Sequence, residues 1–152
     1  MTELFTFLAV LGLDFGTKKW VDEKLPLNRK KEIVRNHLYF WHIKNSGIAY
    51  NRFSGKRKGI LLFTGGILIY YSIQFLNLLR GKGDRRLALP LAMTLGGGLG
   101  NFLERLRKGK VTDFLFVPVE GKNAPIFNIA DLFIWIGAIG LTIIPFVKNV
   151  KK

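Results

Sequence analysis

Three aspartates, Asp14, Asp113 and Asp131, stand inside or at the edge of strongly apolar stretches of this sequence. A charged side chain in hydrocarbon costs about 2.5 to 3.5 kcal/mol on insertion scales, so an acid at such a position indicates a functional site. Two carboxylates that share one site cannot both ionise easily, and the pair then holds a single proton over a broad pH range. The ionised member can take a proton from water while the protonated member polarises a carbonyl group. Such a pair can catalyse hydrolysis without a metal or a covalent intermediate.

The apolar residues come in blocks, in a chain of 152 residues of which 49% are hydrophobic. Residues 59–79 carry no charge, and Asp131 is the one charged residue in 126–147. A helix needs roughly 20 residues to cross a hydrocarbon core, so both blocks are long enough to span a membrane. Residues 4–21 and 87–106 form two weaker blocks. The first lacks the basic start of a secretory signal peptide, so we expect it to stay in the protein as a helix and not to be cleaved off. The sequence therefore predicts an α-helical integral membrane protein with four transmembrane helices, folded as one domain.

The composition and charge exclude several kinds of site. The chain has no cysteine, so it forms no disulfide, no thiolate metal site and no cysteine nucleophile. The two histidines, His37 and His42, are five residues apart on a predicted strand and therefore point to opposite faces. The 24 Lys and Arg outnumber the 10 Asp and Glu and are concentrated between the apolar blocks, which favours contact with anionic membrane lipids over binding of nucleic acid. We expect no metal and no cofactor.

Two polar segments, residues 22–58 and 107–125, connect the predicted helices in pairs. Because the spans alternate in direction, both segments lie on the same side of the membrane. Residues 37–43 and 111–119 have the aromatic and β-branched content of strands, and residues 49–53 could return as a further paired strand after a turn. The sequence therefore predicts a small β-sheet that caps the helices at one membrane face.

Helical spacing places further polar residues at the same membrane boundary. Residues three or four apart lie on one face of a helix. Three such polar pairs are Asp14 with Lys18, Asn101 with Arg105, and Asn128 with Asp131. Each pair alone has a structural explanation, such as an interfacial cation or an acid in the first turn of a helix. Their occurrence at one boundary predicts a polar cluster.

Five short motifs follow one another along the chain. They are Asp14-x-x-Thr17-Lys18, Asn45-x-Gly47-x-Ala49, Gly97-x-x-Gly100-Asn101-x-x-Glu104-Arg105, Val111-x-Asp113-Phe114 and Phe127-Asn128-x-Ala130-Asp131. This ordered set resembles the lipoprotein signal peptidases (signal peptidase II), a family of bacterial membrane aspartic endopeptidases. Each motif alone is weak, whereas the five together cover nearly the whole chain. One departure is Glu104, because the family usually has aspartate at this position.

The resemblance implies four transmembrane helices with an extracytoplasmic β-sheet, called a cradle, and Asp113 and Asp131 as the catalytic pair. Other motif residues would bind substrate or order the site: Asp14, Lys18, Asn45, Gly47, Asn101, Arg105 and Asn128. The implied substrate is a prolipoprotein that carries diacylglycerol on a cysteine and is cut just before that cysteine. The implied location is the bacterial cytoplasmic (inner) membrane, which the protein crosses several times, with its active site at the extracytoplasmic face. We expect a monomer that is in contact with membrane lipids.

Two other functions fit the same residues. A small proton- or ion-coupled carrier would use the aspartates to relay protons, although the acids gather at one face instead of the midplane and no inverted repeat is visible. A non-catalytic scaffold protein would use the glycine-rich third helix as a partner surface. Cleavage of a lipidated prolipoprotein separates a peptidase from both.

Overall fold

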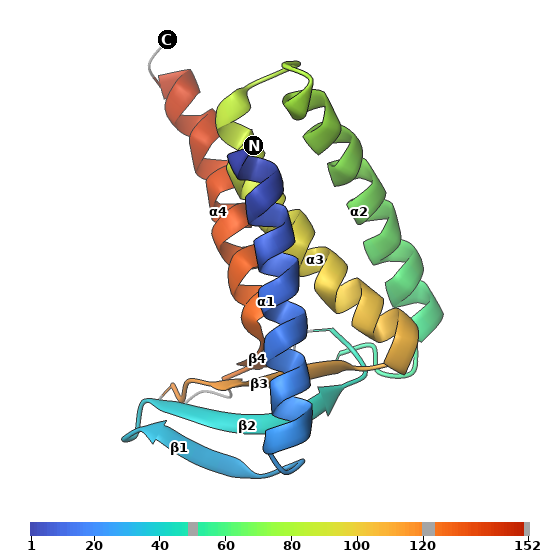
Figure 1. The fold of residues 1–152 in the computed structure, drawn as a ribbon, viewed down its shortest axis with the longest axis vertical. Coiled ribbons are helices and arrows are strands. Elements are labelled where there is room, and N and C mark those ends of the chain that lie inside the picture. The colour runs from blue at the N-terminus through green and yellow to red at the C-terminus, as the bar shows by residue number, and fades with distance from the viewer. Residues whose placement is uncertain (49–51, 120–123, 151–152) are drawn as a thin grey trace.

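Four long helices run side by side in the computed structural model, and a small sheet lies across one of their ends (Figure 1). The structure describes residues 1–48, 52–119 and 124–150. The helices are α1 Thr2–Lys24, α2 Arg57–Leu79, α3 Ala88–Lys108, which follows the short 3-10 helix η2 Arg85–Leu87, and α4 Ile129–Val150. The beginning of α1 and the last turns of α4 lie at the end away from the sheet (Figure 1).

Among the described residues, two helices are long and apolar enough to cross a membrane. They are α2, with a mean hydropathy of 1.7, and residues Ile129–Val147 of α4, with a mean hydropathy of 2.0. Their apolar side chains mostly face outward, and Leu62 and Phe63 of α2 are 79% and 72% exposed. Outward-facing apolar side chains along a whole helix are typical of contact with lipid.

The sheet joins the two polar segments of the sequence. Its strands are β1 Lys30–Val34, β2 Leu38–Asn45, β3 Val111–Phe116 and β4 Ile126–Phe127. They follow the order β1-β2-β3-β4, and each neighbouring pair is antiparallel. The predicted strands at 37–43 and 111–119 therefore correspond to β2 and β3, which pair with each other.

The structure differs from the expected sheet in two places. Strand β1 lies in a basic segment that gave no strand signal, because all five of its residues are exposed and show no alternation. A strand was also expected at 49–53. Arg52 and Phe53 form a turn instead, and residues 49–51 lie outside the described residues. Strand β2 already has β1 on one side and β3 on the other, so no edge is left for a returning strand.

Helix α4 begins later than the apolar block suggests. Ile126 and Phe127 pair with Phe116 and Leu115 as strand β4, so the helix starts at Ile129. Apolar residues at the end of a buried strand and at the start of a helix have the same hydropathy, so the boundary is not visible in composition.

Glycines let α1 and α4 approach α3 closely. A Cβ atom added to Gly97 of α3 would lie 2.4 Å from the backbone oxygen of Ala130 in α4. A Cβ atom on Gly100 would lie 2.3 Å from Oδ2 of Asp14 in α1. Small residues at these positions therefore bring the helix backbones together, and they bring the polar side chains of α1, α3 and α4 to one place.

Candidate active site

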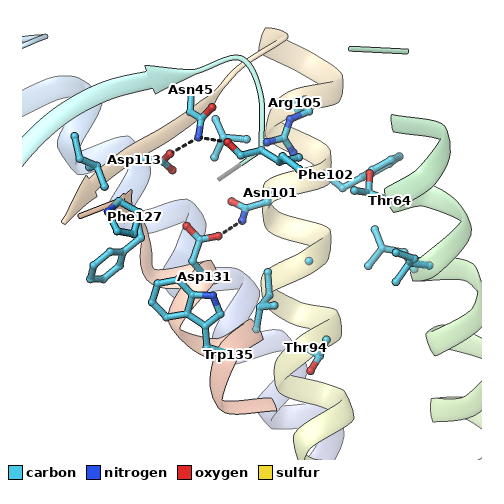
Figure 2. Close-up of a pocket in the computed structure, with 18 of the residues that line it drawn as sticks. Asn45, Thr64, Thr94, Asn101, Phe102, Arg105, Asp113, Phe127, Asp131 and Trp135 are labelled. Carbon is cyan, nitrogen blue, oxygen red and sulfur yellow. Dashed lines mark hydrogen bonds between the residues drawn. The ribbon is translucent and has the colours of Figure 1, made fainter. Parts of the chain in front are cut away.

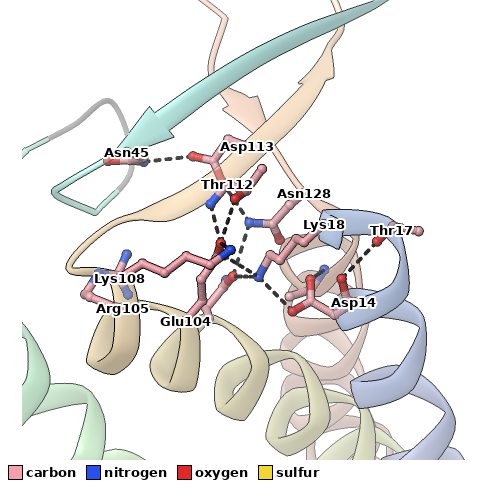
Figure 3. Close-up of polar contacts among 12 residues, drawn as sticks. Asp14, Thr17, Lys18, Asn45, Glu104, Arg105, Lys108, Thr112, Asp113 and Asn128 are labelled. Carbon is pink, nitrogen blue, oxygen red and sulfur yellow. Dashed lines mark hydrogen bonds and ion pairs between the residues drawn. The ribbon is translucent and has the colours of Figure 1, made fainter. Parts of the chain in front are cut away.

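Asp113 lies in the middle of β3, with 3% of its surface exposed. Its Oδ2 accepts a hydrogen bond from Nδ2 of Asn45 at 2.9 Å, and its Oδ1 accepts one from Nδ2 of Asn128 at 2.7 Å (Figure 3). The first donor comes from the end of β2 and the second from the start of α4. Tertiary structure therefore surrounds this carboxyl group with amide donors.

Asp131 lies in the first turn of α4 and takes part in a reciprocal cap with Asn128. The backbone N–H of Asn128 donates to Oδ2 of Asp131 at 3.1 Å, and the backbone N–H of Asp131 donates to Oδ1 of Asn128 at 3.0 Å. This arrangement is a capping box. The other carboxylate oxygen of Asp131 accepts from Nδ2 of Asn101 at 2.8 Å (Figure 2). The cap thus leaves Oδ1 directed toward α3 and the cavity.

Asn128 contacts both aspartates, because its side chain donates to Asp113 and its backbone donates to Asp131. It is fully buried. The two acids are close enough for the charge of Asp131 to act on Asp113. One residue at the start of α4 therefore fixes the strand and the helix that carry the acids.

The protonation of Asp113 is set mainly by burial. Burial raises the pKa of its carboxyl group to about 7, and the negative charge of Asp131 adds to the rise. Hydrogen bonds from Asn45 and Asn128 and the charge of Lys18 oppose it. A carboxyl group with this pKa is poised to exchange a proton near neutral pH.

The raised pKa of Asp113 predicts how stability depends on pH. An acid that holds its proton more tightly when folded makes the fold less stable as the pH rises from the ordinary pKa of the group, 3.8, to its pKa in the folded protein, about 7. Over this range the free energy of unfolding of the wild type, compared with Asp113→Asn, should fall by up to about 1.4 kcal/mol per pH unit. Thermal unfolding of both proteins in detergent across this range measures the difference. A pH-independent difference would contradict the raised pKa.

A buried ion cluster lies behind the aspartates, between α1 and α3. Nζ of Lys18 donates to Oδ2 of Asp14 at 2.7 Å and to Oδ1 of Asn101 at 2.7 Å. Oδ1 of Asp14 accepts from the backbone N–H of Ala130 at 3.3 Å, in the first turn of α4. A carboxylate at a helix N-terminus is stabilised by the helix dipole. Asp14 and Lys18 therefore connect three helices.

Arg105 holds the loop that follows β2. Its Nη2 donates to the carbonyl oxygen of Gly47 at 2.8 Å, and the backbone N–H of Gly47 donates to Oδ1 of Asn45 at 2.9 Å. This places Nδ2 of Asn45 toward Asp113. The structure thus brings together all nine residues singled out in the sequence, whose roles in catalysis stay predictions.

Two residues outside the nine candidate site residues, Glu104 of the third motif and Thr112, belong to the same cluster. Glu104 accepts from the backbone N–H of Thr112 at 3.0 Å and from its hydroxyl at 2.6 Å. Glu104 is 4% exposed and Thr112 is fully buried. A buried charge needs polar partners, so the presence of Glu104 in the third motif already indicated that it would have a partner at the site. Its partner was not visible, because it lies on the following strand.

An apolar cavity of about 310 Å³ opens beside the aspartates, between α2, α3 and α4 (Figure 2). Asn101, Asp113 and Asp131 are among its lining residues, together with Arg105. The remaining wall is mostly apolar and includes Ile67, Leu68, Tyr71, Phe102, Ile134 and Trp135. A largely apolar pocket with a few convergent polar groups is typical of a binding site. Within the described part of the chain, no group of three or more His, Asp and Glu side chains could hold a metal ion.

Known proteins resemble this chain in sequence and in fold. A family model described as signal peptidase (SPase) II matches residues 6–147. The lipoprotein signal peptidase of Listeria welshimeri is 32% identical over 147 residues, which cover 95% of this chain and 92% of the relative. That of Bacillus subtilis (strain 168) is also 32% identical and covers 95% of this chain and 93% of the relative. Two solved structures described as bacterial membrane enzymes have TM-scores of 0.90 and 0.84 at 27% and 28% identity, and they cover 99% and 97% of this chain and 91% and 94% of those chains.

Proposed function

The chain belongs to the signal peptidase II family, and we propose that it removes signal peptides from prolipoproteins with Asp113 and Asp131 as its catalytic pair. The family inferred from the five motifs is thereby confirmed, and the carrier and scaffold hypotheses receive no support. One observation carries the assignment of the pair: a buried carboxyl group, Asp113, and a half-buried one, Asp131, converge at the polar end of an apolar cavity and are held by amide donors. The named relatives are lipoprotein signal peptidases, which supports the substrate class.

The pair would act by sharing one proton. The ionised aspartate accepts a proton from a water molecule, and the water oxygen bonds to the scissile carbonyl carbon. The protonated aspartate donates to the carbonyl oxygen, and its proton compensates the negative charge that develops there. The C–N bond then breaks as a proton passes to the leaving amine. Because titration belongs to the pair, either acid can begin as the base.

The shape of the cavity supports a lipidated substrate. Its apolar wall between α2 and α4 suits the acyl chains of a diacylglyceryl group, while the polar end below the sheet suits a peptide backbone. The resemblance to the family implies a cut just before the lipid-bearing cysteine, and a cavity that holds acyl chains beside a peptide is compatible with that position. Asn45, Asn101 and Arg105 line the polar end and would orient the peptide.

We further propose that α1 and α3 also cross the membrane, with the sheet at the extracytoplasmic face of the bacterial cytoplasmic membrane and the protein acting as a monomer. The positive-inside rule opposes this orientation, since seventeen Lys and Arg would lie outside and seven inside. Positive charge beside a site that binds lipid and peptide also attracts anionic lipid head groups, which would explain Lys and Arg residues on the outer side. A reporter fused after Lys152 is expected to be cytoplasmic, and an extracytoplasmic reporter would overturn the orientation.

Cleavage of a defined substrate tests the function. Purified protein is incubated with a prolipoprotein that carries diacylglycerol on its cysteine, and with the same polypeptide without the lipid. We expect a mobility shift with the lipidated form, and mass spectrometry should place the new N-terminus at the modified cysteine. Absence of cleavage by folded protein would overturn the proposal.

A further inference from the structure

A buried lysine lies behind the proposed catalytic pair. Lys18 is 3% exposed, and its Nζ has three oxygen neighbours (Figure 3). These are Oδ2 of Asp14 and Oδ1 of Asn101, both at 2.7 Å, and Oε2 of Glu104 at 3.4 Å. An ammonium group has three N–H donors and no acceptor, so each donor can be directed at one of these oxygens.

This ammonium group decides how the amide of Asn101 is oriented. A side-chain amide has an accepting oxygen and a donating NH₂ group, and only the oxygen can face a lysine. Nδ2 of Asn101 must then point the other way, toward Oδ1 of Asp131 at 2.8 Å. Oδ1 of Asn101 also accepts from Nδ2 of Asn128 at 3.1 Å, and that same NH₂ group donates to Asp113 at 2.7 Å. Lys18 therefore sets the direction of both amides.

A second route leads from Lys18 to β3. Glu104, which Lys18 contacts, accepts hydrogen bonds from the backbone N–H and the hydroxyl of Thr112. Thr112 immediately precedes Asp113 in the strand. The lysine thus helps to hold the backbone of the strand that carries one of the two acids.

We infer that Lys18 is a positioning residue of the cleavage reaction: its ammonium group holds the amides of Asn101 and Asn128 with their NH₂ groups toward the two aspartates. Without it, the Asn101 amide can rotate by half a turn and present its oxygen to Asp131. Two acceptors would then face each other, and the acid would move. This inference rests on the proposed function. Misplacement of a reacting group by about 1 Å can cost about a hundredfold in rate.

The first test compares Lys18→Met with Lys19→Met. Lys19 is the neighbouring residue of α1, its side chain is 78% exposed, and it serves as the matched control. We expect Lys18→Met to lower kcat by about a hundredfold with little change in KM, and Lys19→Met to cleave normally. The acid limb of the pH profile should also move to higher pH, because the charge of Lys18 lowers the pKa of Asp113. The other charged groups around the site, Asp14, Glu104, Arg105 and Asp131, are retained in this variant.

A second variant keeps the test decisive if Lys18→Met fails to fold. Asn101→Asp preserves an acceptor for Lys18 but replaces the donor to Asp131 with an acceptor, which imitates the rotated amide. We expect its kcat to fall about as far as that of Lys18→Met. Normal cleavage by folded Asn101→Asp, or normal kcat and an unchanged pH profile for folded Lys18→Met, would overturn the inference.

Failure of the inference and failure of the proposed function give different results. If the wild type and Lys19→Met cleave the prolipoprotein, the function stands whatever the Lys18 variant does. If the wild type does not cleave, the side-chain NH₂ signals of Asn101 and Asn128 can still be compared by NMR in asparagine-labelled protein without substrate. Changed NH₂ signals in Lys18→Met support the inference, and signals equal to those of the wild type and of Lys19→Met contradict it.

Discussion

Asp113→Asn and Asp131→Asn are each expected to abolish prolipoprotein cleavage in a protein that stays folded. The substitution keeps the volume and removes the titratable group, so neither amide can serve as base or proton donor. We expect each single change to cost at least about a thousandfold in kcat, and the double change little more, as for residues that act as a unit. In Asp131→Asn the amide oxygen could still accept the hydrogen bond from the backbone of Asn128, so the start of α4 should persist.

The measurement is cleavage of a lipidated prolipoprotein by both single variants and the double variant. Thermal unfolding in detergent is the control for folding. Asp84→Asn is the matched control for activity, because Asp84 caps η2, in the loop between α2 and α3, and does not line the cavity. Turnover close to that of the wild type by either folded single variant would rule out the two-aspartate mechanism.

Substitution of Asn128 is expected to have the second largest effect on cleavage. Two substitutions separate its role as the cap of α4 from its role as a hydrogen-bond donor to Asp113. The side chain caps α4 through its oxygen and donates to Asp113 through its NH₂ group. Serine is also a good N-cap but has no NH₂ group to reach the carboxyl group. Asn128→Ser should therefore keep the cap of α4, and stay more stable than a variant without a cap, while kcat falls about a hundredfold.

Asn128→Ala removes both roles. It should lose the same activity and, in addition, about 1 kcal/mol of stability through the missing cap. The stability of both variants is measured by thermal unfolding, and kcat by the cleavage assay. If Asn128→Ser cleaved as fast as the wild type, the donor to Asp113 would have no role in the reaction.

Much of the fold was predictable because it depends on local sequence. Four helices cover the four apolar blocks, and strands β2 and β3 lie where aromatic and β-branched residues cluster. The edge strand β1 was not predictable, because its residues are all exposed and it is defined by pairing with β2. The start of α4 was missed for the same reason, since Ile126 and Phe127 become a strand only through their partners in β3.

For the candidate site, the sequence by itself determined which residues share a face and which motifs they form. Asp14 and Lys18 are four apart on a helix, and Asn128 and Asp131 are spaced as a capping box, so both contacts follow from the geometry of one turn. Only the tertiary structure decided that Lys18 meets Asn101 and that Glu104 meets Thr112. Helical spacing fixes the direction of a side chain relative to its own helix. Which neighbour it then meets depends on how closely the backbones pack, and here that depends on glycines such as Gly97 and Gly100 in α3.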